Sequence, residues 1–229
     1  MAERESNNMS EKQNELITIS EPRSPISEAY RTLRTNLDFA SLDQALKTLA
    51  VTSAGVGEGK STTLANLAVV SAQVGRKVIL VDADLRRPSL HQIFDLDNDA
   101  GLTTVMMDEA TLASPPLQAT SVEGLSVLTS GPLPPNPAEL MGSRRMEEVI
   151  AVLAEQADQV FFDTPPVVAV TDAAVLATKV DGVLVVISAG KTRREYARTA
   201  VQRLEQINAR LVGTVLTNVE MGAGFQGYY

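Results

Sequence analysis

The residues most able to do chemistry begin with a glycine-rich stretch. Gly55, Gly57 and Gly59 lie directly before Lys60 and Ser61. Glycines at this spacing let successive backbone N–H groups point inward around phosphate oxygens, which side chains would obstruct. The lysine would bring a positive charge to the β- and γ-phosphates, and the serine hydroxyl can ligate Mg²⁺. The spacing therefore predicts a P-loop that binds a nucleoside triphosphate together with Mg²⁺.

All residues of this loop belong to the predicted ATP site. We expect ATP to be bound by Gly55, Val56, Gly57, Glu58, Gly59, Lys60, Ser61 and Thr62. The loop departs from the standard pattern at Ala54, which takes the position of the motif's first glycine. A small residue fits there if its φ stays negative. The alternative is a glycine-rich turn before an ordinary helix, but acidic residues after two other predicted strands favour the phosphate site.

These acidic residues stand at the ends of two apolar segments. Asp82 and Asp84 follow the segment 77–81, and Asp163 follows the segment 159–162. In a parallel sheet the carboxyl ends of such strands emerge at the same edge as the P-loop. The three carboxylates are therefore expected to lie beside the bound phosphates.

Together, the P-loop and the aspartates predict a site for phosphoryl transfer. We expect Ser61, Asp82 and Asp163 to hold Mg²⁺, directly or through water. Lys60, Asp82 and Asp84 are the predicted catalytic residues, because a carboxylate pair near Mg²⁺ can position and deprotonate a hydroxyl nucleophile. The alternative is that the strand-end aspartates only cap helices or turns.

Alternating strands and helices must position these residues. Apolar segments of strand length occur at residues 46–51, 77–81, 159–162, 183–187 and 211–216. Helices are expected from residue 26, with Ser27 as N-cap, from about Lys60, and over residues 137–156, 172–178 and 193–208. Continuous apolar strands separated by helices are typical of a parallel sheet covered on both faces. The pattern predicts an α/β fold with a doubly wound, mostly parallel sheet.

The chain ends are expected to lie outside a single folded domain. Residues 1–22 are mostly polar and are predicted to form a flexible leader, followed by one nucleotide-binding domain over residues 23–218. Residues 219–229 contain three glycines and no periodic pattern. They are predicted to form a flexible tail that ends in Tyr228 and Tyr229.

Composition excludes several classes of protein. A formal net charge of -8 argues against general affinity for nucleic-acid phosphates, so no nucleic-acid partner is expected. Cysteine is absent, which excludes disulfides and cysteine-ligated metals. The chain shows neither the apolar core of a signal peptide nor a run of roughly 18 apolar residues. We expect a cytoplasmic protein that reaches the membrane only through a partner.

Three motifs in combination resemble those of the bacterial tyrosine kinases that control capsule and exopolysaccharide synthesis. They are the loop 54–61, the Asp-x-Asp-x-Arg segment 82–86 and the strand 160–163. The resemblance covers about residues 20–229 and includes the segment 131–140. It implies a P-loop NTPase of the deviant-Walker (MinD/ParA-like) group, which uses ATP and Mg²⁺ as a protein-tyrosine autokinase.

The resemblance also implies a mode of assembly. Glu28, Arg31 and Arg34 match the Glu-x-x-Arg-x-x-Arg helix that joins family members into a ring of identical subunits. Their spacing alone favours an intrahelical salt-bridge stripe instead. Tyr228 and Tyr229 stand where the family has a tyrosine-rich tail, and they are the expected phosphoacceptors.

Two further expectations follow from the resemblance. Asn218 matches a position near the adenine base, although a turn-forming asparagine is the alternative. The chain carries no transmembrane activator, so it resembles the subtype with a separate one. That partner would be a membrane-spanning protein of the polysaccharide co-polymerase type, which recruits the kinase to the inner face of the membrane.

Two other functions remain open on the sequence alone. One is an ATPase switch of the partition or division-site class, but that class has a signature lysine where this chain has Gly55. The other is a non-catalytic ATP-binding scaffold of a polysaccharide assembly complex. The same motifs serve binding and turnover, so the motifs do not discriminate the scaffold from the kinase.

Overall fold

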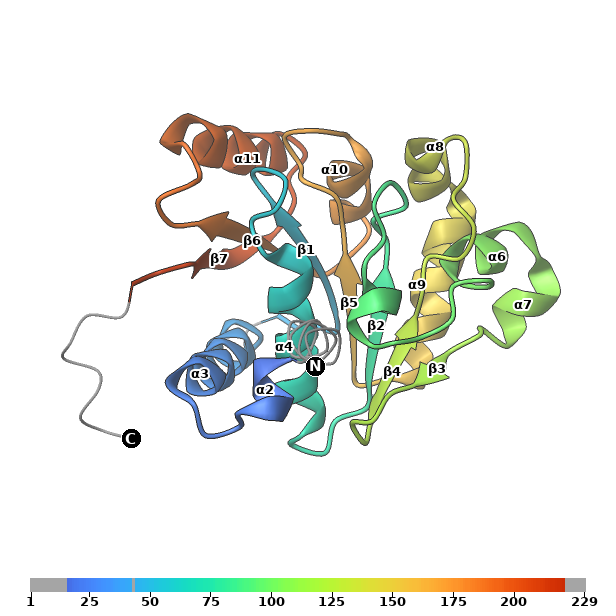
Figure 1. Cartoon of the computed structure of the whole chain (residues 1–229). Coiled ribbons are helices and arrows are strands. Elements are labelled where there is room, and N and C mark those ends of the chain that lie inside the picture. The colour runs from blue at the N-terminus through green and yellow to red at the C-terminus, as the bar shows by residue number, and fades with distance from the viewer. Residues whose placement is uncertain (1–15, 43, 221–229) are drawn as a thin grey trace, which may run out of the picture.

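A sheet of seven strands forms the centre of the protein (Figure 1). The computed structural model describes residues 16–42 and 44–220. The strands are β1 (Thr48–Ser53), β2 (Val78–Asp82), β3 (Gln118–Ala119), β4 (Leu125–Leu128), β5 (Gln159–Asp163), β6 (Gly182–Ser188) and β7 (Leu211–Thr217). Their order across the sheet is β3-β4-β2-β5-β1-β6-β7. Of the described strands, only β3 runs antiparallel to its neighbour, which is β4.

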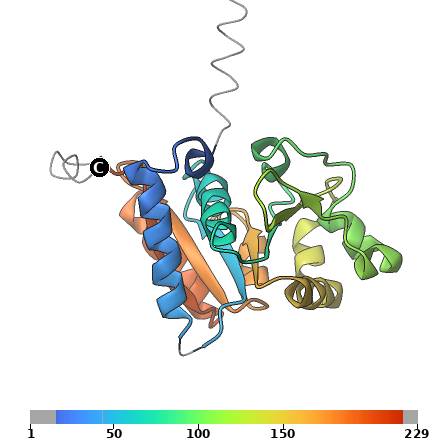
Figure 2. The same cartoon turned by 90° about the horizontal axis from the view of Figure 1, so that it is seen from below.

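Helices cover both faces of this sheet. They are α2 (Ile17–Ser20), α3 (Pro25–Ala40), α4 (Lys60–Ala72), α5 (Leu90–Ile93), α6 (Leu102–Met107), α7 (Glu109–Ala113), α8 (Pro137–Gly142), α9 (Arg144–Gln156), α10 (Asp172–Ala177) and α11 (Arg194–Gln206). Helices α3 and α4 lie side by side and pack on one face (Figures 1 and 2), and α9, α10 and α11 pack on the other. None of the described helices is long and apolar enough to cross a membrane. The predicted doubly wound, mostly parallel α/β fold is confirmed.

Burial holds the carboxyl end of β1 and the start of α4 in place. Strands β1 and β2 are buried along their whole length. Helix α4 is buried on nearly all sides, because it packs on the sheet and against α2, α3 and α5. A helix enclosed in this way has little freedom to shift. Its first residues, Lys60 and Ser61, are therefore held at the carboxyl end of β1.

The first long helix begins differently from the prediction. Its N-cap is Ser24, whose hydroxyl oxygen accepts a hydrogen bond from the backbone N–H of Ser27 at 3.2 Å. Ser27 is buried, and its hydroxyl donates to the carbonyls of Ile17 and Glu21. The expectation that Ser27 is the N-cap was wrong, because Pro25 suits the first helical position and starts the helix earlier.

The helix expected over residues 137–156 is two helices. Ser143 leaves the helical conformation and caps α9, its hydroxyl accepting from the backbone N–H of Met146 at 3.3 Å. Strands β3 and β4 were not predicted, since β3 has 2 residues and β4 has 4. Segments this short show too little periodicity to be recognised.

The folded part of the chain begins before the expected boundary at residue 22. Leu16 is buried, and Thr18 donates to Asn66 Oδ1 from its backbone N–H at 3.1 Å and from its hydroxyl at 2.8 Å. Residues 16–22 therefore belong to the domain, and the predicted leader was too long at this end. Tyr228 and Tyr229 lie outside the described residues.

Candidate functional site

The P-loop connects β1 to α4 through residues 54–59. Gly57 and Gly59 have φ values of +70° and +85°, a region that strains any residue with a side chain. Ala54 does not adopt a positive φ and is buried, so this departure from the motif is accommodated as expected. The N-terminus of α4, with its free N–H groups and positive dipole end, completes a cradle for phosphate.

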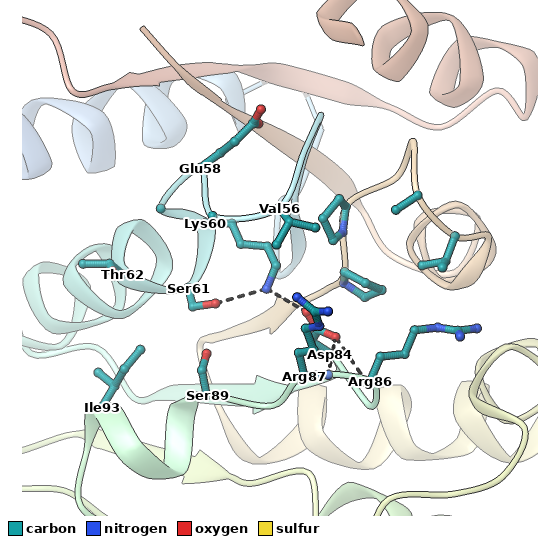
Figure 3. A pocket seen from close by; sticks show the side chains of 16 residues that line it. Val56, Glu58, Lys60, Ser61, Thr62, Asp84, Arg86, Arg87, Ser89 and Ile93 are labelled. Carbon is teal, nitrogen blue, oxygen red and sulfur yellow. Dashed lines mark hydrogen bonds and ion pairs between the residues drawn. The ribbon is translucent and has the colours of Figure 1, made fainter. Parts of the chain in front are cut away.

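Glu58 shapes the loop from behind. Its carboxylate accepts hydrogen bonds from the backbone N–H of Ala54 at 3.0 Å and from the Thr192 hydroxyl at 2.6 Å. Its own carbonyl accepts from the Thr217 hydroxyl at 2.8 Å. In Figure 3 the Glu58 side chain points away from Lys60. Only the backbone of Glu58 is therefore available to a nucleotide. The side chain ties the loop to Thr192, in the segment after β6, and the backbone carbonyl ties it to β7.

Lys60 joins the acidic residues to the loop. Its Nζ lies 3.0 Å from Asp84 Oδ2, and it donates to Ser61 Oγ at 3.1 Å (Figure 3). The same Nζ lies 3.2 Å from Asp163 Oδ1. Burial alone would lower the pKa of Lys60, but the charges of Asp163 and Asp84 and their hydrogen bonds outweigh it, so the pKa is raised. Lys60 therefore stays positively charged although its side chain is only 12% exposed.

Asp82 occupies a different position from the other two aspartates. Its Oδ2 accepts from the backbone N–H groups of Ser89 and Leu90, each at 2.9 Å, so it fixes the start of α5. Its Oδ1 has no hydrogen-bond partner among the described residues. Burial raises the pKa of Asp82 to about 7, and the charge of Asp163 adds to this effect. Asp82 thus has the capping role of the alternative interpretation and also lies beside Asp163.

Asp84 is both a turn cap and a partner of Lys60. Its Oδ1 accepts from the backbone N–H groups of Arg87 at 3.0 Å and Arg86 at 3.4 Å. The other carboxylate oxygen faces Lys60. One carboxylate therefore fixes the turn after β2 and also reaches the phosphate cradle.

Lys60 and Asp84 border a cavity of about 540 Å³. One wall is the P-loop with the start of α4, residues 56–62, and the opposite wall includes Asp84, Arg86 and Arg87 (Figure 3). Pro165 and Pro166, which follow β5, add an apolar side. Ligand pockets of roughly 300–1,000 Å³ accommodate molecules of nucleotide size. The cavity therefore has the size, the positive charge of Lys60 and the phosphate cradle that ATP requires.

The oxygen atoms around Lys60 suit Mg²⁺. Ser61 Oγ and the Asp163 carboxylate both contact Lys60 Nζ, so they lie around one point. Across residues 16–42 and 44–220, no cluster of three or more His, Cys, Asp or Glu side chains could hold a metal ion by itself. Mg²⁺ is usually held by one or two carboxylates together with substrate phosphates. The donor set fits a Mg²⁺ ion whose coordination the phosphates and water complete.

Other residues expected at the site lie outside this cavity. Asn218 directly follows β7 and has a φ of +55°, and its side-chain amide donates to Ser188 Oγ at 2.8 Å. The positive φ agrees with the turn-forming alternative. Asn218 is next to Thr217, which contacts the P-loop, so a place near the base stays a prediction.

The three residues expected at a subunit interface lie on α3. Arg31 forms an intrahelical ion pair with Glu28 at 2.7 Å. Arg34 donates to the carbonyl of Val70 at 3.0 Å, so it also ties α3 to α4. The intrahelical alternative is thus present in the single chain, and the interface role stays a prediction.

Two residues that support the site had not been found from the sequence. Asp172 forms an ion pair with Arg86 of the cavity wall, and Thr192 holds Glu58. They lie 86 and 134 positions from these partners. No local motif reports contacts at such separation, whereas Ser89 could have been found because it closely follows Asp84.

Comparison with known proteins agrees with this geometry. Residues 44–223 match the ParA family model, described as an NUBPL iron-transfer P-loop NTPase. The tyrosine-protein kinase YwqD of Bacillus subtilis (strain 168) is 46% identical over 224 residues, which cover 97% of this chain and 94% of YwqD. The putative tyrosine-protein kinase CapB of Staphylococcus aureus is 38% identical, with 91% of each chain covered.

A solved structure gives the same result. The chimerical protein CapA2B2 superimposes with a TM-score of 0.83 at 40% sequence identity, and 88% of each chain is covered. The family model covers most of the described domain, and the two relatives are matched over nearly their whole length. The chain therefore belongs to the bacterial tyrosine kinases, the protein-tyrosine autokinases of capsule and exopolysaccharide synthesis, within the ParA-type P-loop NTPases.

Proposed function

We propose that this kinase transfers the γ-phosphate of ATP to Tyr228 and Tyr229 of a neighbouring copy, with Lys60, Asp84 and Asp163 at the centre of the reaction. The observation that supports this best is the contact of Lys60 with both carboxylates at the mouth of the P-loop. Phosphoryl transfer to a hydroxyl depends on positioning and on charge neutralisation, and these three groups supply both.

The proposed roles follow from the position of each group. Lys60 and the P-loop N–H groups bind the β- and γ-phosphates. Mg²⁺, held by Ser61, Asp163 and Asp82, would neutralise negative charge on these phosphates. Asp84 accepts the proton of the tyrosyl hydroxyl while the tyrosyl oxygen bonds to the γ-phosphorus. The bond from that phosphorus to the β–γ bridging oxygen breaks, and ADP leaves.

Asp84 is a better candidate for the base than Asp82. Asp84 lines the cavity, so a tyrosyl hydroxyl that enters can reach it. Asp82 is buried and does not line the cavity, and one of its oxygens already accepts two hydrogen bonds. Of the two carboxylates, we therefore propose Asp84 alone as the base.

The proposal includes two kinds of partner. Identical subunits would assemble through Glu28, Arg31 and Arg34, whose side chains are only partly buried on α3. A separate membrane-spanning activator would recruit the kinase to the cytoplasmic face of the membrane. The similarity to a chimerical protein agrees with a kinase that works joined to a second polypeptide. A net charge of -8 is unsuited to a nucleic-acid partner.

One experiment separates the kinase from its alternatives. The full chain is incubated with Mg-ATP, with and without membranes that contain the activator, and probed with an antibody to phosphotyrosine. Phosphotyrosine supports the kinase. Release of inorganic phosphate alone would support an ATPase switch, and neither product would support a scaffold that only binds ATP.

A further inference from the structure

An ion pair joins Arg86, at the edge of the cavity, to the buried Asp172. The guanidinium of Arg86 donates from Nε to Asp172 Oδ2 at 2.8 Å and from Nη2 to Asp172 Oδ1 at 3.1 Å. Asp172 is only 1% exposed and lies in the first turn of α10. A two-point contact to a buried carboxylate fixes both the place and the orientation of an arginine.

Arg86 belongs to the same turn as Asp84. The Asp84 carboxylate accepts from the backbone N–H groups of Arg86 and Arg87, and its other oxygen lies 3.0 Å from Lys60 Nζ. The backbone that orients Asp84 is therefore the backbone whose side chain Asp172 holds. The contacts run in one line from Asp172 through Arg86 and Asp84 to Lys60.

We propose that Asp172 is a positioning residue for phosphoryl transfer, which acts through Arg86 to hold Asp84 Oδ2 toward Lys60 and the cavity. Asp172 does not line the cavity, so it touches neither ATP nor the tyrosine directly. The inference rests on the proposed role of Asp84 as the base. Figure 3 shows the Arg86 side chain directed away from Lys60, as this role requires.

Helix α10 has contacts with the core besides this ion pair. Ala173, Leu176 and Ala177 of this helix are buried in the core on the same face of the sheet as α9 and α11. Asp172→Asn keeps the size of the side chain and leaves Arg86, which is 41% exposed, free to be hydrated. This variant therefore removes the two-point contact without burying an unpaired charge.

The first test measures the maximal rate of autophosphorylation and the ATP concentration for half-maximal rate, on the full chain. Asp172→Asn is expected to lower the maximal rate by about a hundredfold, the loss typical when a reacting group is displaced by about 1 Å. The half-saturating ATP concentration should stay within about twofold, because the P-loop is untouched. Asp172→Glu, which keeps the charge, should recover about tenfold of the lost rate.

A matched control separates this role from general stability. Asp38 and Arg76 form a similar two-point ion pair, at 2.7 Å and 2.9 Å, that ties α3 to the residues before β2 and does not line the cavity. Asp38→Asn should leave the rate within about twofold of wild type. A wild-type rate for Asp172→Asn, or a loss no larger than that of Asp38→Asn, would overturn the inference.

A double-mutant cycle tests the connection to Asp84. If Asp172 acts only through Asp84, adding Asp172→Asn to Asp84→Asn slows the reaction by less than about twofold further. If the rate losses of the two single variants multiply in the double variant, Asp172 acts by another route. That result would overturn its proposed action through Asp84. A wild-type rate in Asp84→Asn alone would instead remove the proposed base, a failure distinguishable from that of Asp172.

Discussion

Asp82 and Asp163 stand directly opposite each other on the neighbouring parallel strands β2 and β5, and both are fully buried. Burial and the charge of Asp163 together raise the pKa of Asp82 to about 7, and hydrogen bonds from Leu90 and Ser89 only partly oppose them. Burial also raises the pKa of Asp163, although the charge of Lys60 acts in the opposite direction. The pair is costly to ionise fully, which favours a bound cation at this edge.

The first prediction concerns the pH dependence of stability. A carboxyl with a raised folded pKa binds its proton more tightly when folded, so the free energy of unfolding decreases as pH rises from 3.8 through about 7. Asp82→Asn removes this loss and still accepts hydrogen bonds from Ser89 and Leu90. Its Tm, relative to wild type, should therefore increase between about pH 5 and about pH 8.

Thermal unfolding followed by circular dichroism, without nucleotide or Mg²⁺, measures this difference. Asp99→Asn serves as the control, because Asp99 is exposed and its loss also removes one carboxylate. If the Tm of Asp82→Asn minus that of wild type stays constant or decreases as pH rises, the raised pKa of Asp82 is contradicted.

The second prediction concerns the cation at the phosphate site. Lys60→Met removes the charge that Asp84 and Asp163 share, and the loop N–H groups alone do not replace it. Autophosphorylation at saturating Mg-ATP should fall by at least about a hundredfold. The matched control is Lys191→Met, since Lys191 donates to the P-loop carbonyl of Gly57 at 2.8 Å but has no contact with these carboxylates. A Lys60→Met rate within about tenfold of wild type would show that the site is misassigned.

The third prediction concerns the support of the P-loop. Glu58→Ala leaves the buried N–H of Ala54 without its acceptor, a loss of about 1–3 kcal/mol. Because Glu58 then no longer holds the loop in the shape that the structure shows, ATP affinity measured by calorimetry should fall by about tenfold. Glu58→Gln keeps an acceptor oxygen, so its ATP affinity should fall by less. Glu205→Ala, an exposed position on α11, is the control, and equal ATP affinity in all variants would refute the role of Glu58.

The fourth prediction concerns assembly. Replacing Glu28, Arg31 and Arg34 together by Ala should convert the proposed oligomer to monomers while ATP binding stays unchanged. Alanine favours helix, and only the contact of Arg34 with Val70 ties this set to α4, so α3 should persist. The control on the same helix replaces the exposed Thr32 and Thr35 by Ala. Light scattering measures the mass, and an equal mass for the triple variant and wild type would contradict the interface.

The strands and the P-loop could be predicted because their signals are local. A strand buried on both faces is recognised from a run of consecutive apolar residues. The P-loop is recognised from the glycines directly before Lys60. The contact of Lys60 with Asp84 and Asp163 followed from one further rule, that parallel strands end at a common edge.

The supporting contacts could not be predicted in the same way. The bond between Glu58 and Thr192, and the ion pair between Arg86 and Asp172, join elements that only the folded sheet brings together. The N-cap was misplaced for a local reason. Ser24 and Ser27 both suit the start of a helix, and Pro25 at the first helical position decides for Ser24. Tertiary contacts decided the first two cases, which the sequence does not report locally.

The most direct test of the account is where phosphate goes in wild type and in Asp84→Asn. Both proteins are incubated with Mg-ATP, and their phosphorylated residues are mapped by mass spectrometry after ATP binding is shown to be equal. The account predicts phosphate on Tyr228 and Tyr229 of wild type, and at least about a hundredfold slower transfer in Asp84→Asn. Hydrolysis of ATP without phosphotyrosine in wild type, or undiminished phosphotyrosine in Asp84→Asn, would contradict it.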